Sequence, residues 1–419
     1  MTRNLLLFIA AFAACLVAIS GSNKVRYDNF RVYRIRVENV EQIKFLDNLK
    51  HFPESVIIWE YLQKMFPAKN SGGNADVMVH PDKFEEFENM LKKLIDEEQN
   101  IDPALSDNTF GWSRYYKLPD IYSWLDDLQK NHPNQVTPFA IGKSYEGRTI
   151  RGIKISFKSG NPGIFIEANI HAREWIASAT ATYVIDQLLN SKDPKVRDIA
   201  ENIDWYIIPV LNVDGFTYTH EVVGDRLWRK TRQPNPTSDC VGVDPNRNFD
   251  SYWSANGGAS SYPCDETYAG PKPFSEPETS ALASYFNSIK EKISIYIAFH
   301  TYGQLLLSPY GHTDTEFPKN YEDMQTIAFA TINSIAKRYG TSYRYGSTAS
   351  TLYTASGTSP DWAYNTQNAP LAFTFEFRDK GAHGFVLPPD QIKPNAEEAM
   401  DGLLSMVKQA RKLNYLKQK

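Results

Sequence analysis

The pattern of apolar and polar residues divides the chain into a short first part and a long second part. In the first part, "FRVYRIRV" at residues 30–37 alternates like a half-buried strand, and residues 40–49 have the apolar spacing of an amphipathic helix. Residues 55–62 and 75–81 predict two more strands, and residues 81–100 predict a second helix. Strand and helix thus occur twice, which is typical of a small α+β domain of the split βαβ, ferredoxin-like kind.

From Tyr115 onward, long apolar runs alternate with helical patterns. The near-continuous apolar runs predict strands covered on both faces, and they occupy residues 149–157, 163–170, 204–212, 293–300 and 369–377. Helical spacing recurs between them, in residues 176–191, 276–290 and 321–340. We expect a capping box of Ser275 and Glu278 at the second helix and an end at Gly340 for the third. The second part therefore predicts an α/β domain with a mixed, largely parallel central sheet flanked by helices.

The N-terminus predicts a targeting segment. Residues 4–19 form an apolar run behind Arg3 and are followed by Ser20, Gly21 and Ser22, which is typical of a cleavable signal peptide over residues 1–20. No other window approaches the roughly 20 apolar residues of a membrane span. We therefore expect a secreted, extracellular protein with no membrane partner.

The net charge bears on nucleic-acid binding, and the cysteine content bears on disulfide formation. The formal net charge of -4 over 419 residues is close to neutral and leaves no basic footprint for a nucleic acid. Cys15 leaves with the signal peptide, so Cys240 and Cys264 remain as a pair that could form a disulfide in an oxidising compartment. Two free buried thiols are the alternative.

Reactive side chains follow three of the predicted strands. "IEANIHARE" carries His171 and Glu174, "IYIAFH" ends in His300, and "LAFTFE" ends in Glu376. Sites in open α/β sheets form at the carboxyl ends of strands, so these side chains are expected to meet. Two histidines and a carboxylate with an open fourth position are the ligands of a catalytic zinc. One His-x-x-Glu motif is not specific by itself, because a lone histidine is commonly structural.

Two further carboxylates fit such a site. Glu376 lies in an otherwise apolar strand end, where an unpaired carboxylate costs several kcal/mol or shifts its pKa. Asp244, in "GVDPNRNF", could hold the second ring nitrogen of a ligating histidine.

A set of short segments in this order resembles the secreted zinc procarboxypeptidases of the A/B metallocarboxypeptidase family, along nearly the whole chain after the signal peptide. The segments are "YEGR", "IHAREW", "NVDGF", "LWRKTR", "GVDPNRNF", "HTYGQLLLSPYG", "SGTSPDW" and "FTFEFRDKG". The resemblance implies an activation domain over residues 21–104 and a zinc carboxypeptidase catalytic domain over residues 105–419. It also implies peptide or protein C-termini as substrates, an activating protease as a partner, and a monomer.

The resemblance assigns the catalytic residues. One zinc ion per chain is bound by His171, Glu174 and His300, and Glu376 is the general base that takes a proton from a water on the metal. Arg229, in "LWRKTR", polarises the scissile carbonyl.

The same resemblance assigns the substrate-binding residues and the disulfide. Asn246 and Arg247 bind the C-terminal carboxylate, and Tyr353 closes over the bound residue. The resemblance implies that Arg173, Tyr302 and Phe385 line the neighbouring subsites. It also implies a disulfide between Cys240 and Cys264.

The residue at position 360 predicts the specificity. Relatives that remove Lys or Arg carry an acid at the position of Pro360, where a buried cation would here have no partner. The other matching pocket positions are small and uncharged: Gly311, Thr348, Ala349, Ala355 and Thr374. We therefore expect an A-type enzyme for neutral aliphatic or aromatic C-terminal residues. Pro360 and Thr358 depart from the usual residues, so a broader preference stays open. The alternatives are a B-type enzyme, a peptide-binding pseudoenzyme, and a processor of regulatory peptides.

The connector between the two domains predicts an unusual activation. Residues 95–113 contain no Lys or Arg, so a tryptic cut would have to fall at Lys92, Lys93 or Arg114. Activation by another protease, or at a site on the predicted helix, is the resulting hypothesis.

Overall fold

The chain forms two compact units. In a computed structural model, residues 110–221 and 224–417 are described in full, and before residue 110 the backbone of four strands is described. One unit contains Met1–Ser106 and Tyr218–Leu227, and the other contains Asp107–Thr217 and Trp228–Lys419.

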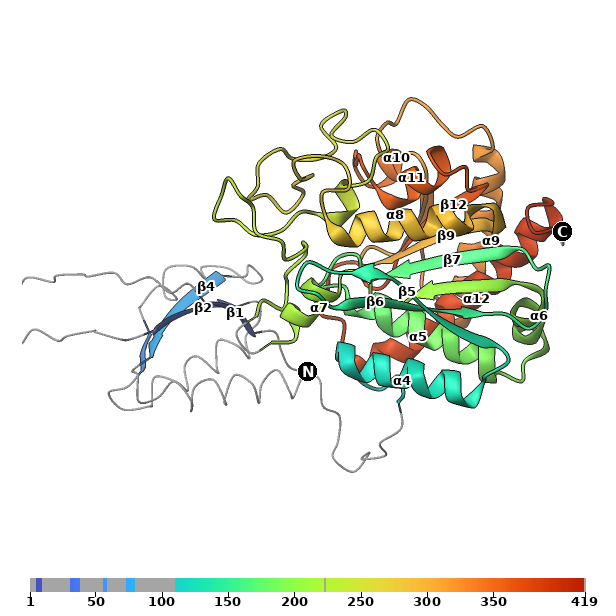
Figure 1. The fold of residues 1–419 in the computed structure, drawn as a ribbon, viewed down its shortest axis with the longest axis horizontal. Coiled ribbons are helices and arrows are strands. Elements are labelled where there is room, and N and C mark those ends of the chain that lie inside the picture. The colour runs from blue at the N-terminus through green and yellow to red at the C-terminus, as the bar shows by residue number, and fades with distance from the viewer. Residues whose placement is uncertain are drawn as a thin grey trace, which may run out of the picture. The chain divides into compact units, whose positions relative to one another are not determined.

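The first unit contains a four-stranded antiparallel sheet in the order β1-β2-β4-β3 (Figure 1). Its strands are β1 (Leu5–Ile9), β2 (Arg31–Val37), β3 (Val56–Ile58) and β4 (Gly73–Val79). The last three confirm the predicted strands. The two helices predicted at 40–49 and 81–100 lie outside the described residues. β1 lies within the predicted signal peptide, and removal of that peptide stays a prediction.

The second unit is built on an eight-stranded mixed sheet in the order β11-β10-β12-β9-β7-β8-β6-β5. Its middle strands β8, β7, β9 and β12 are mutually parallel. β6 is antiparallel to both β8 and β5, whereas β10 is antiparallel to β12 and parallel to β11. Five strands were predicted: β6 (Thr149–Ile155), β7 (Gly163–Ala168), β8 (Asp204–Ile208), β9 (Ile293–His300) and β12 (Leu371–Glu376). The predicted mixed, largely parallel sheet is therefore confirmed.

Three strands of this sheet were not predicted. They are β5 (Val136–Lys143), β10 (Leu305–Ser308) and β11 (Arg344–Ser347). β5 is an edge strand in which only Val136 is buried, and the other two have four residues each. Such strands carry too little apolar periodicity to be distinguished from loops.

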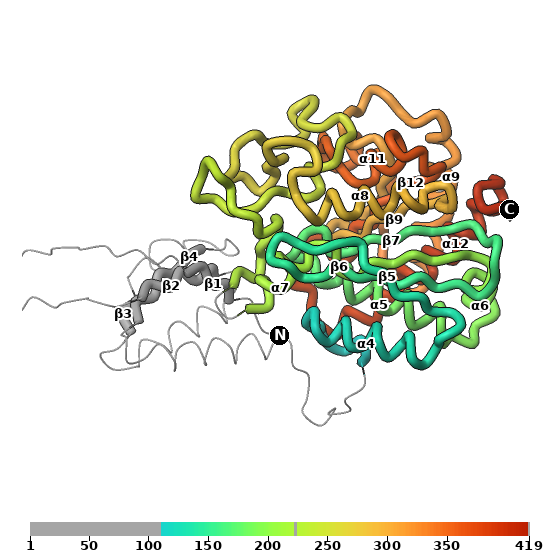
Figure 2. The backbone as a smooth tube through the Cα atoms, viewed as in Figure 1, coloured from blue at the N-terminus to red at the C-terminus, as the bar shows by residue number. Residues whose placement is uncertain are grey.

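Helices cover both faces of the sheet. Figure 1 shows α4 (Leu118–Asn131) and α5 (Trp175–Asn190) on one side, and α8 (Pro277–Ile289) and α11 (Ser359–Asn365) on the other. In Figure 2 the C-terminal helix α12 (Ile392–Lys412) runs behind the sheet on the side of α5, and it packs against α5 and α9 (Tyr321–Tyr339). The shorter helices are α6 (Pro194–Asn202), α7 (Val213–Thr219) and α10 (Thr348–Thr351).

The two predicted helix boundaries have different outcomes. α9 ends as expected at Gly340, whose φ of 75° is in the left-handed region. The capping box predicted for α8 is wrong, because the N-cap residue is Glu276. The Ser275 hydroxyl instead donates to the Glu276 carboxylate at 3.0 Å, and Glu278 accepts from the Tyr145 backbone N–H at 3.1 Å. The Ser275 hydroxyl also accepts from the Asn248 amide at 2.9 Å, so contacts with Asn248 and Tyr145, both distant in sequence, replace the capping box.

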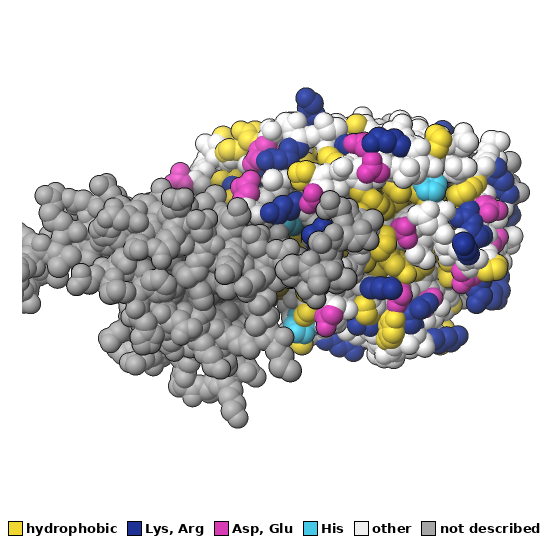
Figure 3. Space-filling view, turned by 90° about the horizontal axis from the view of Figure 1, so that it is seen from below, with side chains coloured by type: hydrophobic (Ala, Val, Ile, Leu, Met, Phe, Trp, Pro, Cys, Tyr) yellow, Lys and Arg dark blue, Asp and Glu magenta, His cyan; other side chains and the backbone are white. Residues whose placement is uncertain are grey.

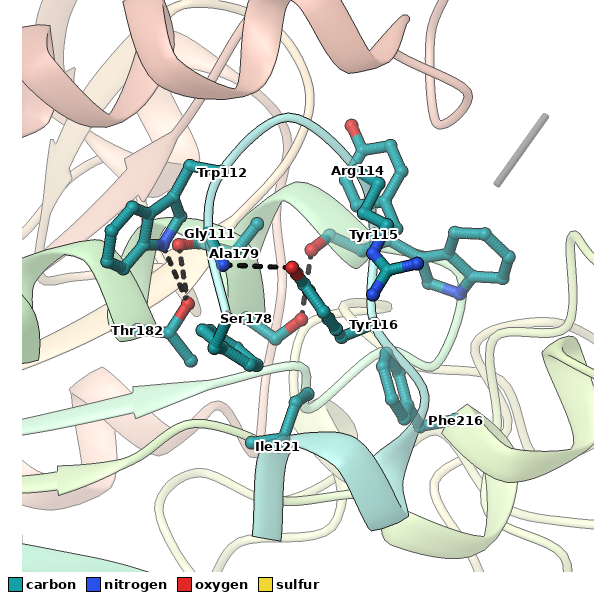
Figure 4. Close-up of a pocket in the computed structure, with 12 residues that line it drawn as sticks. Gly111, Trp112, Arg114, Tyr115, Tyr116, Ile121, Ser178, Ala179, Thr182 and Phe216 are labelled. Atoms are coloured by element: carbon teal, nitrogen blue, oxygen red, sulfur yellow. Dashed lines mark hydrogen bonds between the residues drawn. The ribbon is translucent and has the colours of Figure 1, made fainter. Parts of the chain in front are cut away.

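The first described residues of the second unit are packed onto α5 and α4. Phe110 stacks on Tyr116 and Trp124, with ring centroids 4.1 and 4.5 Å apart. The Trp112 indole N–H donates to the Thr182 hydroxyl at 3.2 Å, as the dashed line in Figure 4 shows. The segment before α4 is thus part of the core of this unit.

Surface and covalent features agree with the sequence. Cys240 and Cys264 form a disulfide, which excludes two free thiols. On the described surface in Figure 3, basic and acidic side chains are interspersed, as the small net charge leads us to expect. Among the described residues, no helix combines the length and apolar character needed to cross a bilayer.

Candidate metal centre and peptide-binding site

Three adjacent parallel strands bring the predicted ligands to one edge of the sheet. β7 pairs with β9, and β9 pairs with β12, so their carboxyl ends lie side by side. Glu376 is the direct register partner of His300, and His171 follows β7 by three residues. The expectation that these strand ends meet is confirmed.

Asn169 shapes the turn that carries His171 and Glu174. Its φ of 53° is left-handed, a conformation that Asn tolerates better than most residues. Its amide nitrogen donates to the backbone carbonyl of His171 at 3.3 Å, and its Oδ1 accepts from the Ser178 backbone N–H at 2.9 Å. Glu174 then becomes the N-cap residue of α5. Asn169 was not predicted from the sequence, where its only local signal was its place immediately after a buried strand.

The three predicted ligands form a compact, buried group. One ligand atom from each of His171, Glu174 and His300 lies within 4.8 Å of the others, and these residues are the one such group found among the described residues. The two Nδ1 atoms are 3.2 Å apart, and the Glu174 oxygens lie 2.8 and 3.0 Å from them. Ligands of tetrahedral zinc at about 2.0–2.1 Å are separated by roughly 3.3 Å. The set fits a zinc ion after slight outward shifts of the side chains.

The electrostatics of the group also favour a cation. Burial and the nearby Arg229 lower the pKa of His171, which keeps its imidazole neutral. Burial opposes charge on His300, yet the Glu174 carboxylate raises the pKa of His300 to about 9. Burial alone would raise the pKa of Glu174, but the two facing histidines lower it. A metal cation can take the place of a proton on His300, because metal binding displaces protons from its ligands.

Asp244 connects the metal group to two arginines. Its Oδ1 lies 3.2 Å from His171 Nε2, and its Oδ2 accepts from Arg229 Nε and Nη2 at 3.0 and 2.7 Å. Arg247 Nη1 lies 3.9 Å from the same oxygen. Burial would raise the pKa of this carboxyl, but Arg229, Arg247 and His171 hold it well below its usual range. The contact with the histidine was predicted, whereas the contacts with the arginines were not.

Glu376 and Arg229 lie around the metal group. The Glu376 side chain is partly accessible to solvent, and burial of its carboxyl raises the pKa to about 8. Arg229 is buried; burial opposes its charge, but Asp244 raises its pKa. The site therefore contains a carboxyl basic enough to bind a proton near neutral pH and a fixed cation.

The predicted carboxylate-binding residues lie in a short turn, η3 (Pro245–Arg247), next to Asp244. Arg247 is buried, and its Nε has no hydrogen-bond partner among the described residues. The ring of Tyr353 lies 5.8 Å from the Arg247 guanidinium, and this tyrosine is 49% exposed. A buried guanidinium with an unused donor suits an anionic ligand.

The three residues predicted for neighbouring subsites lie together. The Arg173 guanidinium lies 4.1 Å from the centre of the Phe385 ring, and Tyr302 packs edge-on to that ring at 4.9 Å. Arg173 also donates to Glu266 at 2.9 Å, a contact that the sequence did not predict.

The pocket positions converge around Gly311 and α11. A Cβ on Gly311 would lie 2.7 Å from the Ala355 carbonyl oxygen and 3.5 Å from Thr348, so only glycine fits there. Thr358 is the N-cap residue of α11, and Pro360 occupies its first turn. Asp361 was missed: its carboxylate accepts from the backbone N–H groups of Gly311 and His312.

The fold and the site define a class: an α/β protein with a mononuclear metal centre at the carboxyl edge of a mixed sheet. A zinc carboxypeptidase family model matches residues 121–402, and a carboxypeptidase activation peptide model matches residues 33–94.

Individual proteins show the same likeness. Zinc carboxypeptidase A 1 of Anopheles gambiae is 40% identical, over 98% of this chain and 96% of that protein. A zinc carboxypeptidase of Simulium vittatum is 52% identical, over 72% of this chain and 98% of that protein. The crystal structure of carboxypeptidase A from Helicoverpa armigera matches with a TM-score of 0.70 at 28% identity, over 92% of this chain and 98% of that chain.

This chain therefore belongs to the zinc carboxypeptidase family, as a precursor with an activation peptide. It is a metallocarboxypeptidase of the A/B branch, and its cofactor is zinc.

Proposed function

We propose that this chain is the secreted, monomeric precursor of an exopeptidase that removes neutral aliphatic or aromatic residues from the C-termini of peptides and proteins. The observation that supports it most directly is the placement of Glu376 beside the buried group of His171, Glu174 and His300, at the end of adjacent strands. A zinc ion held there acts as a Lewis acid and lowers the pKa of water bound to it toward about 7.

The protein's own groups supply the proton transfer and the charge stabilisation. Glu376, with its raised pKa, accepts a proton from the attacking water and donates it to the departing amine. Arg229 donates to the substrate carbonyl oxygen as negative charge develops on it. Its two hydrogen bonds to Asp244 hold the guanidinium in place, so little reorganisation is needed during the reaction.

Recognition of the free terminus falls to the turn that follows Asp244. Asn246 and Arg247 bind the terminal carboxylate, and Tyr353 moves over the bound residue from its exposed position. Arg173, Tyr302 and Phe385 contact residues that precede the scissile bond. An exopeptidase needs such an anion site one residue away from the reacting bond.

The pocket supports a preference for neutral side chains. Asp361 is the carboxylate nearest Gly311, and both of its oxygens accept backbone N–H groups. The carboxylate nearest to a lysine or arginine side chain in this pocket would therefore already be hydrogen-bonded to the backbone. The buried cation would lack a partner, at a cost of several kcal/mol. Pro360 offers no charge in its place.

Two blocked dipeptides, one ending in Phe and one in Arg, test the proposal after proteolytic removal of the activation peptide. We expect faster hydrolysis of the Phe substrate, loss of activity with a zinc chelator, and recovery with zinc. Glu376→Gln should lower kcat about a thousandfold with unchanged zinc content. A preference for the Arg substrate would establish the B-type alternative. Binding without hydrolysis would establish a peptide-binding protein.

Activation is the second part of the proposal. The connector has no Lys or Arg between residues 95 and 113, so we expect the natural activating protease to cut at residues of another kind. N-terminal sequencing of the active enzyme tests this. A new terminus immediately after Lys92, Lys93 or Arg114 would contradict it.

A further inference from the structure

Glu167 is a buried carboxyl close to the catalytic site that the proposed reaction does not use. It lies in the central strand β7, has no solvent exposure, and its register partners are Ala298 in β9 and Ile208 in β8. Its Oε1 accepts from the Ser359 hydroxyl at 2.9 Å, whereas Oε2 has no partner in the described part of the chain. Burial raises the pKa of Glu167 to about 7. A carboxyl with one hydroxyl donor is costly to bury unless it remains protonated.

A second buried polar group faces the same place. Tyr296 lies two residues before Ala298 on the same face of β9, and its buried hydroxyl has no hydrogen-bond partner among the residues described. Burial first, and then the Glu167 charge, raise the pKa of this tyrosine. A protonated Glu167 provides the donor that the Tyr296 hydroxyl lacks, while its other oxygen still accepts from Ser359. One hydrogen bond, from a protonated Glu167 to the Tyr296 hydroxyl, would satisfy both Glu167 Oε2 and the Tyr296 oxygen.

Ser359 connects this group to the carboxylate-binding turn. Its hydroxyl donates to Glu167, and its backbone N–H donates to Asn246 Oδ1 at 2.9 Å. An Asn side chain has one acceptor oxygen and one NH₂ group. With Oδ1 held by Ser359, the NH₂ group of Asn246 remains for an anionic ligand. The orientation of this amide thus depends on the position of Ser359.

We propose that Glu167 is a positioning residue for recognition of the substrate's C-terminal carboxylate, acting through Ser359 on the amide of Asn246. Glu167 touches neither substrate nor metal in this scheme. The inference rests on the proposed function, because it assigns to Asn246 the binding of the terminal carboxylate. It predicts that loss of Glu167 weakens binding of that carboxylate and leaves the chemical step and the zinc site intact.

Glu278 offers a matched control. It is also a fully buried glutamate with one unpartnered oxygen among the described residues, and burial also raises its pKa to about 7. Its hydrogen bond is to the backbone N–H of Tyr145, away from Ser359 and Asn246. An effect that follows from replacing any buried glutamate should appear in the variants of Glu167 and of Glu278 alike.

The test compares Glu167→Leu, Glu167→Gln, Ser359→Ala and Glu278→Gln in the activated holoenzyme. The measurements are kcat and KM for the dipeptide ending in Phe, the inhibition constant of 3-phenylpropionate as a small carboxylate probe, and bound zinc. We expect Glu167→Leu to raise KM and the inhibition constant together by about tenfold, as for loss of one positioned hydrogen bond, with kcat within threefold and one zinc per chain. Glu167→Gln should stay close to wild type, because the amide keeps one acceptor and one donor.

Three outcomes would overturn the inference. They are unchanged KM and inhibition constant in both Glu167→Leu and Ser359→Ala, a fall in kcat or zinc content without a change in binding, and an equal rise of KM in Glu278→Gln. If Glu167→Leu does not fold, Ser359→Ala decides the question, with an expected rise of several-fold. If the wild-type enzyme removes no C-terminal residue at all, the proposed function fails instead, and that result is seen before any variant is compared.

Discussion

Replacement of Asp244 with Asn tests how one buried charge holds the metal site and the neighbouring arginine in place. The substitution preserves shape and removes the charge. Asp244 has no solvent exposure, and it accepts two hydrogen bonds from Arg229 and one from the backbone N–H of Asn246. It also lies 3.2 Å from His171 Nε2. The variant therefore perturbs stability, zinc affinity and catalysis at once.

The three effects have separate sizes. Removing one partner of a buried ion pair typically costs 3–5 kcal/mol, and because Asn keeps some hydrogen bonds we expect a loss of about 3 kcal/mol in the free energy of unfolding. Loss of the carboxylate that orients a ligating histidine typically weakens metal binding 10–100-fold. Arg229 loses its charged anchor, so kcat/KM at saturating zinc should fall about a hundredfold.

Three measurements separate these effects: urea unfolding, zinc competition with a chelator, and kinetics in zinc-buffered solution. Asp250→Asn is the control, because Asp250 lies in the same segment but is exposed. Full recovery of kcat/KM by excess zinc would refute the role assigned to the contact with Arg229. Zinc affinity equal to that of the control would refute the role assigned to the contact with His171.

Three further predictions concern the second unit. Burial raises the pKa of Glu278 from 4.5 to about 7, so the wild-type free energy of unfolding falls by up to about 3 kcal/mol as the pH rises between these values. The Glu278→Gln variant should not show this loss, so its free energy of unfolding should rise relative to that of wild type between pH 5 and pH 8. A difference in the free energy of urea unfolding that does not change with pH would contradict this. Replacing both Cys240 and Cys264 with Ser should lower the free energy of unfolding by about 3 kcal/mol, since the bridge spans 24 residues. A urea midpoint of the wild-type protein that does not change when a reductant is added would contradict this. Trp112→Ala should destabilise the activated enzyme by roughly 2–3 kcal/mol, because it removes three aromatic contacts and the hydrogen bond to Thr182; a melting temperature equal to that of wild type would show that this segment is not part of the core.

The candidate metal site could be predicted from the sequence because its residues follow strands of unusually clear pattern. His171, His300 and Glu376 each come at or just after a near-continuous apolar run, and the carboxyl ends of parallel strands necessarily meet at one edge. The motif order then led to the family, and the disulfide followed from it. Such runs predict strands reliably, because a near-continuous apolar segment has to be buried on both faces.

Other features depend on contacts between distant segments. The residues Ser275 and Glu278 have the sequence pattern of a capping box, yet in the folded chain Asn248 and Tyr145 form hydrogen bonds with these side chains. The short strand β10 pairs with β12, and β11 pairs in turn with β10, so both depend on a strand far away in the sequence.

The sequence by itself determined where the main strands and helices lie along the chain, because these follow from residue type and short-range periodicity. The candidate metal ligands and the cysteine pair came from the order of its short motifs, through the family that they resemble. The tertiary structure alone decided that Asp244 also binds Arg229, and that Glu167 is linked to Asn246 through Ser359. Glu167 and Ser359 are 192 residues apart, and hydrogen bonds over such separations depend on how the sheet and α11 pack. No local pattern records that packing.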